Sequence, residues 1–133
     1  MDPARLKAIP IFSHLSDEEA NRLSAFATET SVANGQILMK QGDYSTELIG
    51  IEEGTADVIR DGKKIASLKE GDLIGEMGLL EREPRNADVI ATSPMVVMKL
   101  THWEIRRMSE ETLGRIQEIV AKRRDAGVGD PAH

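Results

Sequence analysis

Turn signals built on glycine recur through the middle of the chain and separate short apolar runs. Each signal pairs a glycine with a polar residue, and the steps between successive signals are roughly 7 to 11 residues. They are Asn34-Gly35, Gln41-Gly42-Asp43, Glu53-Gly54, Asp61-Gly62 and Glu70-Gly71. Short strands at this spacing are typical of a β-sandwich or a β-barrel. The pattern therefore predicts that the middle of the chain is mainly β-structure.

The runs between these signals alternate as strands do. Ala56 and Val58 fall on one face of a predicted strand, and Asp57 falls on the other. Asp61-Gly62 follows this strand, and such a pair between apolar runs is the strongest short signal for a β-hairpin. Residues 95–100 are nearly all apolar, as in a strand that is covered on both faces.

Helical patterns are found at the two ends of the chain. Ser16 and Glu19 have the spacing of a capping box at the start of a helix. Upstream of them, Pro10 interrupts an apolar stretch, which predicts a short irregular or helical lead-in. Two C-terminal helices are predicted, and the apolar face of the last one is marked by Leu113 and Ile116.

Length and charge limit the possible functions. The chain has 133 residues, with 17 Lys and Arg against 23 Asp and Glu, so its formal charge is −6, and it has no cysteine. This length suits one domain, which we place at residues 1–125, followed by a disordered tail at 126–133. The acidic balance argues against nucleic-acid binding, and the lack of cysteine excludes disulfides and thiolate metal sites. No apolar run approaches the ~20 residues of a membrane span, and the N-terminus lacks a signal-peptide pattern, so we expect a cytoplasmic protein.

One stretch, residues 75–89, breaks the alternation of the strands. Residues 75–80 are long enough for a single helical turn, whose free N–H groups and positive dipole end suit an anion. Arg85 follows, and its planar guanidinium can hold two oxygens of one phosphate. Glu76 would repel a phosphate, so we expect it to accept hydrogen bonds from hydroxyl groups elsewhere on the same ligand.

Together these patterns predict a mainly β fold of the α+β class. We expect an antiparallel β-roll, or jelly roll, of about eight strands. The helical lead-in, the short helix of residues 75–80 and the two C-terminal helices would flank this roll.

The stretch Gly75-Glu76-Met77-Gly78-Leu79-Leu80, followed by a spacer and Pro84-Arg85-Asn86-Ala87, resembles the phosphate-binding cassette of cyclic-nucleotide-binding domains. Such domains occur in the catabolite activator protein, in kinase regulatory subunits and in gated ion channels. Residues 11–16 resemble the family's opening helix motif. Residues 41–43 and 48–54 resemble its early strands and the glycine turn between them, and residues 71–76 resemble the lead into the cassette. The resemblance therefore covers most of the chain.

The resemblance implies a role for each matched residue. Glu76 would accept the ribose 2′-hydroxyl, Arg85 would pair with the cyclic phosphate, and backbone N–H groups near Met77 and Asn86 would donate to that phosphate. The full ligand-binding set is Gly75, Glu76, Met77, Gly78, Arg85, Asn86 and Ala87. Val58, Ile65 and Ile74 would line the pocket for ribose and base, and Arg123 and Arg124 on the last helix would form a lid.

Three nearby positions qualify this assignment. Asn86 stands where a Thr in relatives is associated with cyclic GMP, so the resemblance favours cyclic AMP and leaves cyclic GMP as an alternative. Asp88 stands where kinase-type relatives often carry Thr or Ser, and alternation puts it on the face opposite Ala87 and Val89, so we expect it in solvent. Arg82 lacks the Ala that follows two residues after Arg85, so we expect it in solvent.

The implied function is a sensor that binds a cyclic nucleotide and moves its flanking helices in response. We expect no enzyme, because the sequence shows no Ser-His-Asp order, no Walker loop and no metal-ligand spacing of histidines. We likewise expect no cofactor and no metal. A ligand-free protein–protein interaction module on the same fold stays open. The predicted partners are the cyclic nucleotide, an effector protein in trans and a second copy through the C-terminal helix, with no nucleic acid and no membrane.

Overall fold

The computed structural model describes residues 1–13, 15–43, 47–74, 87–101, 114 and 118. The helices in this part of the chain are α1 (Pro3–Lys7), the 3₁₀ helix η1 (Pro10–Phe12) and α2 (Asp17–Phe26). The strands are β1 (Thr28–Val32), β2 (Ile37–Met39), β3 (Glu47–Glu53), β4 (Ala56–Arg60), β5 (Lys63–Leu68), β6 (Leu73–Ile74), β7 (Asp88–Ala91) and β8 (Met95–Thr101). None of these described helices has the length and apolar character needed to cross a membrane.

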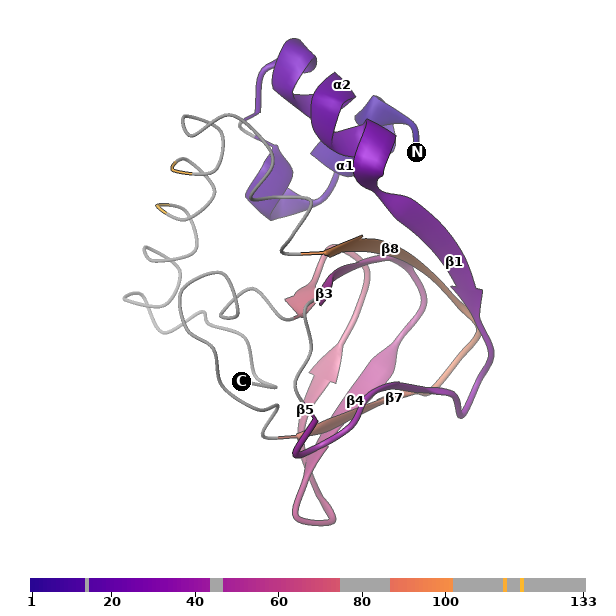
Figure 1. Ribbon diagram of the computed structural model, residues 1–133. Coiled ribbons are helices and arrows are strands. Elements are labelled where there is room, and N and C mark those ends of the chain that lie inside the picture. Colours follow the sequence, from indigo (N-terminus) through magenta and orange to yellow (C-terminus); the bar gives the residue numbers. More distant parts are fainter. Residues whose placement is uncertain (14, 44–46, 75–86, 102–113, 115–117, 119–133) are drawn as a thin grey trace.

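The described strands form two sheets of four strands each. The first sheet has the order β1-β8-β3-β6, and the second has the order β2-β7-β4-β5. Every pairing is antiparallel. Among the described strands, β4 and β5 are the only two that are both paired with each other and consecutive in the chain. The chain therefore passes repeatedly from one sheet to the other, as Figure 1 shows. This architecture confirms the predicted antiparallel β-roll.

The N-terminal helices pack together on one side of the roll (Figure 1). The predicted capping box is present: the Glu19 backbone N–H donates to Ser16 Oγ, and the Ser16 backbone N–H donates to Glu19 Oε1, both at 3.1 Å. Helix α2 buries Ala20 and Leu23. The predicted lead-in is also confirmed, because α1 and η1 lie on the two sides of the break before Pro10.

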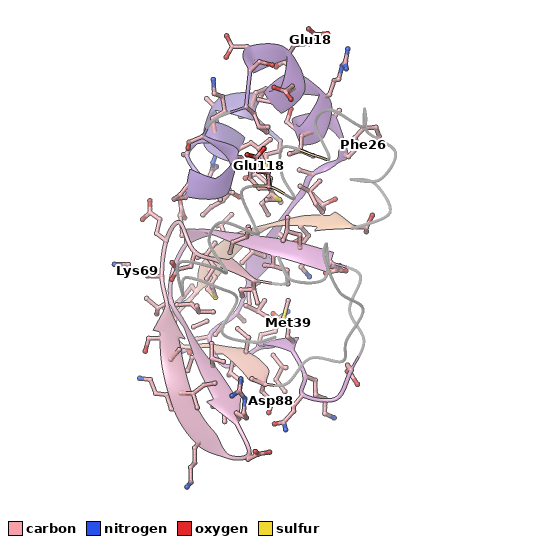
Figure 2. The ribbon with its side chains drawn as sticks, turned by 90° about the vertical axis from the view of Figure 1, so that its left-hand side faces the viewer. Glu18, Phe26, Met39, Lys69, Asp88 and Glu118 are labelled. Carbon is pink, nitrogen blue, oxygen red and sulfur yellow. The ribbon has the colours of Figure 1, made fainter. Side chains whose placement is uncertain are left out.

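The first sheet lies between two apolar cores. The helix-side core consists of Leu6, Ile9, Phe12, Leu15, Ala20, Leu23, Ala27, Leu48, Leu73, Met98 and Leu100. The roll interior, between the two sheets, consists of Val32, Met39, Ile49, Ile51, Ala56, Val58, Leu68, Ile74, Ala87, Val89, Ala91, Met95 and Val97. In Figure 2, Glu18 on α2 and Asp88 on β7 lie at opposite ends of the molecule, with the first sheet between them. The two-sided burial predicted for residues 95–100 is confirmed.

A glycine in β3 allows the helices to lie close to the first sheet. A Cβ atom added at Gly50 would lie 2.9 Å from Ile9 Cδ1 and 3.1 Å from Met98 Cε. Both distances are shorter than ordinary carbon–carbon contacts. The missing side chain is therefore replaced by the side chains of Ile9 and Met98, which is a common reason for glycine inside a strand.

The predicted hairpin joins β4 and β5. Arg60 pairs with Lys63, so the turn has two residues, Asp61 and Gly62. Both have positive φ, 52° and 78°, which is the conformation of a type I′ turn. The short helix of the cassette, the two C-terminal helices and the tail at 126–133 lie outside the described residues, apart from Gly114 and Glu118, which are helical.

A buried carboxylate lies on β3 where this strand bulges. Ile51 pairs with Val97 and Glu53 pairs with Val96, so Glu52 is an extra residue in β3. Bulges of this kind turn a side chain away from the regular alternation. Glu52 is 9% exposed, although glutamate is rarely buried to this extent without a partner.

Arg5 on α1 reaches Glu52 and its neighbours. Its Nε lies 2.8 Å from Glu52 Oε1, and its two terminal nitrogens lie 3.5 Å from Glu29 Oε2 and 3.7 Å from Glu53 Oε1. One guanidinium on α1 thus faces three carboxylates on β1 and β3. This cluster links the first helix to the first sheet.

These surroundings raise the pKa of Glu52 from 4.5 to about 7. Burial is the largest cause, followed by a hydrogen bond with Glu29 and by the negative charges of Glu29 and Glu53, while Arg5 acts in the opposite direction. The two carboxyl groups can share that hydrogen bond when one of them holds a proton. At neutral pH a large fraction of Glu52 is therefore protonated in the folded protein.

We predict that the free energy of unfolding contains a component that is lost as the pH rises through the pKa of Glu52. In the unfolded chain this carboxyl ionises near 4.5, whereas the folded protein holds its proton to about 7. The component amounts to up to about 3 kcal/mol, is fully present below the unfolded pKa and is lost by about pH 8. Glu52→Gln cannot titrate, so its profile should lack this component. Urea unfolding of both proteins from about pH 5 to about pH 8 measures the difference.

Glu18→Gln is the matched control for this experiment. Glu18 is an exposed residue of α2 whose Oε1 lies 2.7 Å from Nη2 of Arg22. Replacing this carboxylate should leave the pH dependence of the free energy of unfolding as in the wild type, because exposed ion pairs contribute little to stability. Parallel profiles for the wild type and Glu52→Gln would contradict the prediction.

Candidate functional site

The predicted cassette connects the two sheets. It follows β6, which is an edge strand of the first sheet, and precedes β7, which is an inner strand of the second. Most of the predicted ligand-binding residues lie outside the described part of the chain: Gly75, Glu76, Met77, Gly78, Arg85 and Asn86, as well as Arg123 and Arg124 of the predicted lid. Their roles stay predictions.

The two residues that border the cassette are both buried in the roll interior. Ile74 precedes it and Ala87 follows it, and each is 0% exposed. Ile74 is fixed by its pairing with Ile49 of β3. The roll therefore brings the residues on both sides of 75–86 into one apolar cluster, although Ile74 ends a strand of the first sheet and Ala87 precedes a strand of the second.

The predicted apolar wall is present in part. Val58 on β4 and Ile74 on β6 belong to the roll interior and are 0% exposed. Ile65 is 44% exposed and the structure does not bring it together with them. The reason is local: Val58 pairs with Ala66 and Ile59 pairs with Lys64, so Ile65 is the extra residue of a bulge, and Ala66 points inward instead.

Polar residues at the start of β7 and at the turn between β4 and β5 are joined by hydrogen bonds to Gln41. The backbone N–H of Gln41 donates to Asp88 Oδ1 at 2.6 Å. Its side-chain amide donates to Asp61 Oδ1 at 2.9 Å and accepts from the Asp61 backbone N–H at 3.1 Å. Gln41 thus joins the start of β7 to the turn of the β4–β5 hairpin.

Asp88 lies on the face of β7 that points away from the roll interior. Its neighbours Val89 and Ala91 are buried in the roll interior, whereas Asp88 is half-buried on the other face of β7. The predicted orientation away from Ala87 and Val89 is confirmed, but Asp88 is half-buried beside Gln41 rather than in solvent. The contact with Gln41 could not be predicted from the sequence, because the two residues are 47 positions apart and no local pattern links them.

Comparison with known proteins identifies the family. A family model described as the cyclic nucleotide-binding domain matches residues 29–112, which include the roll and the cassette. The chain belongs to the cyclic nucleotide-binding domain family.

Several known proteins are similar to the chain in sequence or in fold. It is 31% identical over 134 residues to the cAMP-dependent protein kinase regulatory subunit of Hypocrea atroviridis, covering 96% of this chain and 28% of that protein. The solved N-terminal domain of a transcriptional regulator from Streptomyces coelicolor A3(2) superposes with a TM-score of 0.80 at 27% identity, covering 92% of each chain. A putative cyclic nucleotide-binding protein from Geobacter metallireducens GS-15 shares the fold, with a TM-score of 0.82, 23% identity and coverage of 95% and 97%. The chain spans about a third or less of the length of the curated relatives that it matches first.

We predict that Val58 and Ile65 differ sharply in their contribution to the stability of this nucleotide-binding fold. Val58→Ala removes buried atoms from the roll interior and should lower the free energy of unfolding by about 1–3 kcal/mol. Ile65→Ala removes more atoms from an exposed position and should change it by less than about 0.5 kcal/mol. Urea unfolding measures both values, and equal losses would show that Ile65 is packed in solution.

Proposed function

We propose that this domain is a regulatory, non-catalytic module that binds cyclic AMP through residues 75–86 and the apolar residues of the roll interior. The observation that carries the proposal is the burial of Ile74 and Ala87 in one cluster. These are the two residues that border the matched cassette, one on each side of it. The similarity to a cAMP-dependent protein kinase regulatory subunit supports the choice of ligand.

In this proposal the ligand supplies a partner for each polar cassette residue. Arg85 pairs with the cyclic phosphate, and Glu76 accepts the ribose 2′-hydroxyl. Backbone N–H groups near Met77 and Asn86 donate to the same phosphate. A chain with a formal charge of −6 needs such local donors to hold an anion, because its overall field repels one. Val58 and Ile74 provide apolar surface for ribose and base.

The proposed response is a movement of the flanking helices. Leu73 and Ile74 are consecutive residues of β6, yet Leu73 belongs to the helix-side core and Ile74 to the roll interior. The cassette begins at the next residue. A shift of β6 on ligand binding would therefore reach α1, η1 and α2 through the contacts of Leu73. We propose that Arg123 and Arg124 close over the base and that an effector protein in trans receives the signal.

We predict that Arg85→Ala weakens cyclic AMP binding by about 2–5 kcal/mol, because it removes one partner of an enclosed charge pair. Arg82→Ala is the matched control, since it removes the same charge three residues earlier and should change the affinity little. Isothermal titration calorimetry with cyclic AMP measures both. Wild-type affinity in Arg85→Ala, or an equal loss in Arg82→Ala, would refute the assignment of Arg85.

We also predict that cyclic AMP raises the melting temperature more than cyclic GMP does at the same concentration. A ligand that binds the native state stabilises it according to its affinity. Thermal unfolding of the wild type with each nucleotide, and of Arg85→Ala as a control, measures the two shifts. A larger shift with cyclic GMP would reverse the ligand preference, and no shift with either would favour the ligand-free interaction module.

A further inference from the structure

The second sheet has two edge strands among those described, β2 and β5, and β5 is the longer. Its 6 residues, Lys63–Leu68, pair with β4 on one side, and no other described strand pairs with it. Every second residue of an edge strand directs its backbone N–H and C=O groups away from the sheet. β5 therefore has an edge to which an extended peptide can add a further strand.

This edge is positively charged in an acidic chain. Residues 60–69 contain four basic residues against one acidic residue, which gives +3, whereas the whole chain has −6. Asp57 on β4 offsets one of these charges, since its Oδ1 lies 3.4 Å from Nζ of Lys64. Lys63 and Lys69 are exposed, and neither makes an ion pair with another residue of the described part of the chain. Two cations of this edge are thus available to a partner.

A groove of about 390 Å³ lies beside the end of β5, on the side away from the hairpin turn. Asp57, Lys64, Ser67, Lys69 and Thr92 contribute to its lining. Asp57 and Lys64 pair with each other, so Lys69 is the charge of this lining that still lacks a counter-ion among the described residues. Figure 2 shows its side chain extending outward from the ribbon. The groove therefore suits a carboxylate, which Lys69 can pair with and a hydroxyl can hydrogen-bond.

Ile65 gives the same edge an apolar contact. It is the extra residue of the bulge in β5 and is 44% exposed. Ser67, two residues later, is also exposed, whereas Ala66 between them packs against the roll interior. Alternate residues of a strand share a face. A strand added here would therefore place one side chain beside Ile65 and another, two positions away, beside the groove.

We propose that β5 binds an extended segment of a partner protein by strand addition, and that this segment carries an apolar and an acidic residue two positions apart. Its backbone would hydrogen-bond to the outer edge of β5, its apolar side chain would cover Ile65, and its carboxylate would pair with Lys69. A second copy of this chain is a poor occupant, because pairing β5 with itself would bring two positive strands together. None of these residues belongs to the cassette, so the test requires no cyclic nucleotide.

Titration of the full chain with the blocked peptide Glu-Val-Thr-Glu-Thr-Val-Glu tests this proposal. The peptide reads the same in both directions, so it presents Val and Glu two positions apart whether it binds parallel or antiparallel to β5. Amide NMR shifts at Lys64, Ile65 and Ser67 give the affinity, and hydrogen exchange of the β5 amides reports strand addition. We expect saturable shifts, slower exchange along β5 and weaker binding as the salt concentration rises.

Two further peptides separate strand addition from attraction between charges. Glu-Pro-Thr-Glu-Thr-Pro-Glu keeps the charge, but its prolines cannot donate to a sheet. Lys-Val-Thr-Lys-Thr-Val-Lys keeps the capacity to form a strand and reverses the charge. Each should bind at least about tenfold more weakly than the first peptide.

Variants of the exposed residues test the edge itself. The double variant Lys63→Glu/Lys69→Glu should weaken binding of the first peptide at least about tenfold, and Ile65→Asp should do the same by removing the apolar contact. Lys40→Glu is the matched control, because Lys40 is exposed and follows β2 at the opposite edge of the same sheet. Its affinity should stay within about twofold of the wild type. All four positions are exposed, so the substitutions should spare the fold.

Four results would overturn the proposal. The first is the absence of saturable shifts along β5 with the first peptide. The second is equal affinity for the proline-containing peptide, which would show attraction between charges without strand addition. The third is wild-type affinity in both Lys63→Glu/Lys69→Glu and Ile65→Asp. The fourth is a wild-type dimer in analytical ultracentrifugation that Ile65→Asp dissociates, which would assign this edge to a second copy of the chain.

Discussion

The burial of the first sheet on both of its faces is the constraint on which the rest of the structure depends. Consecutive residues of β3 and β8 belong to different cores: Leu48 and Met98 pack toward the helices, and Ile49 and Val97 pack toward the second sheet. Such a layer tolerates few polar groups. It also sets how near the helices can come, because the absence of a side chain at Gly50 is what allows Ile9 to reach the strand.

Two side chains depart from the regular alternation of buried and exposed positions, and both lie at β-bulges. Glu52 is the extra residue of a bulge in β3, and Arg5 from the first helix covers it. Ile65 is the extra residue of a bulge in β5, where an apolar side chain is turned outward. A bulge thus buries a carboxyl group in the first sheet, and another bulge exposes a hydrophobic side chain in the second. The first exception places a carboxyl group beneath Arg5 of the first helix, and the second removes a residue from the predicted apolar wall.

The sequence was sufficient for features that depend on local chemistry. The turn at Asp61-Gly62, the capping box of Ser16 and the two-sided burial of residues 95–100 each follow from a short pattern, and each is confirmed. Bulges and long-range contacts could not be predicted in this way. The contact of Gln41 with Asp88 and the burial of Glu52 depend on which strands pair and in which register. For the site, the burial of Val58 and Ile74 was predictable, whereas the roles of Glu76 and Arg85 rest on family resemblance.

The burial of Ile74 and Ala87 also has an entropic consequence. A free chain must lose conformational entropy to bring the ends of a segment together, on the order of 2 kcal/mol for a loop as long as residues 75–86. Folding of the roll has already joined these ends in one apolar cluster. The entropy cost of joining Ile74 to Ala87 is therefore covered by the apolar contacts of the roll and does not fall on any later event in the segment between them.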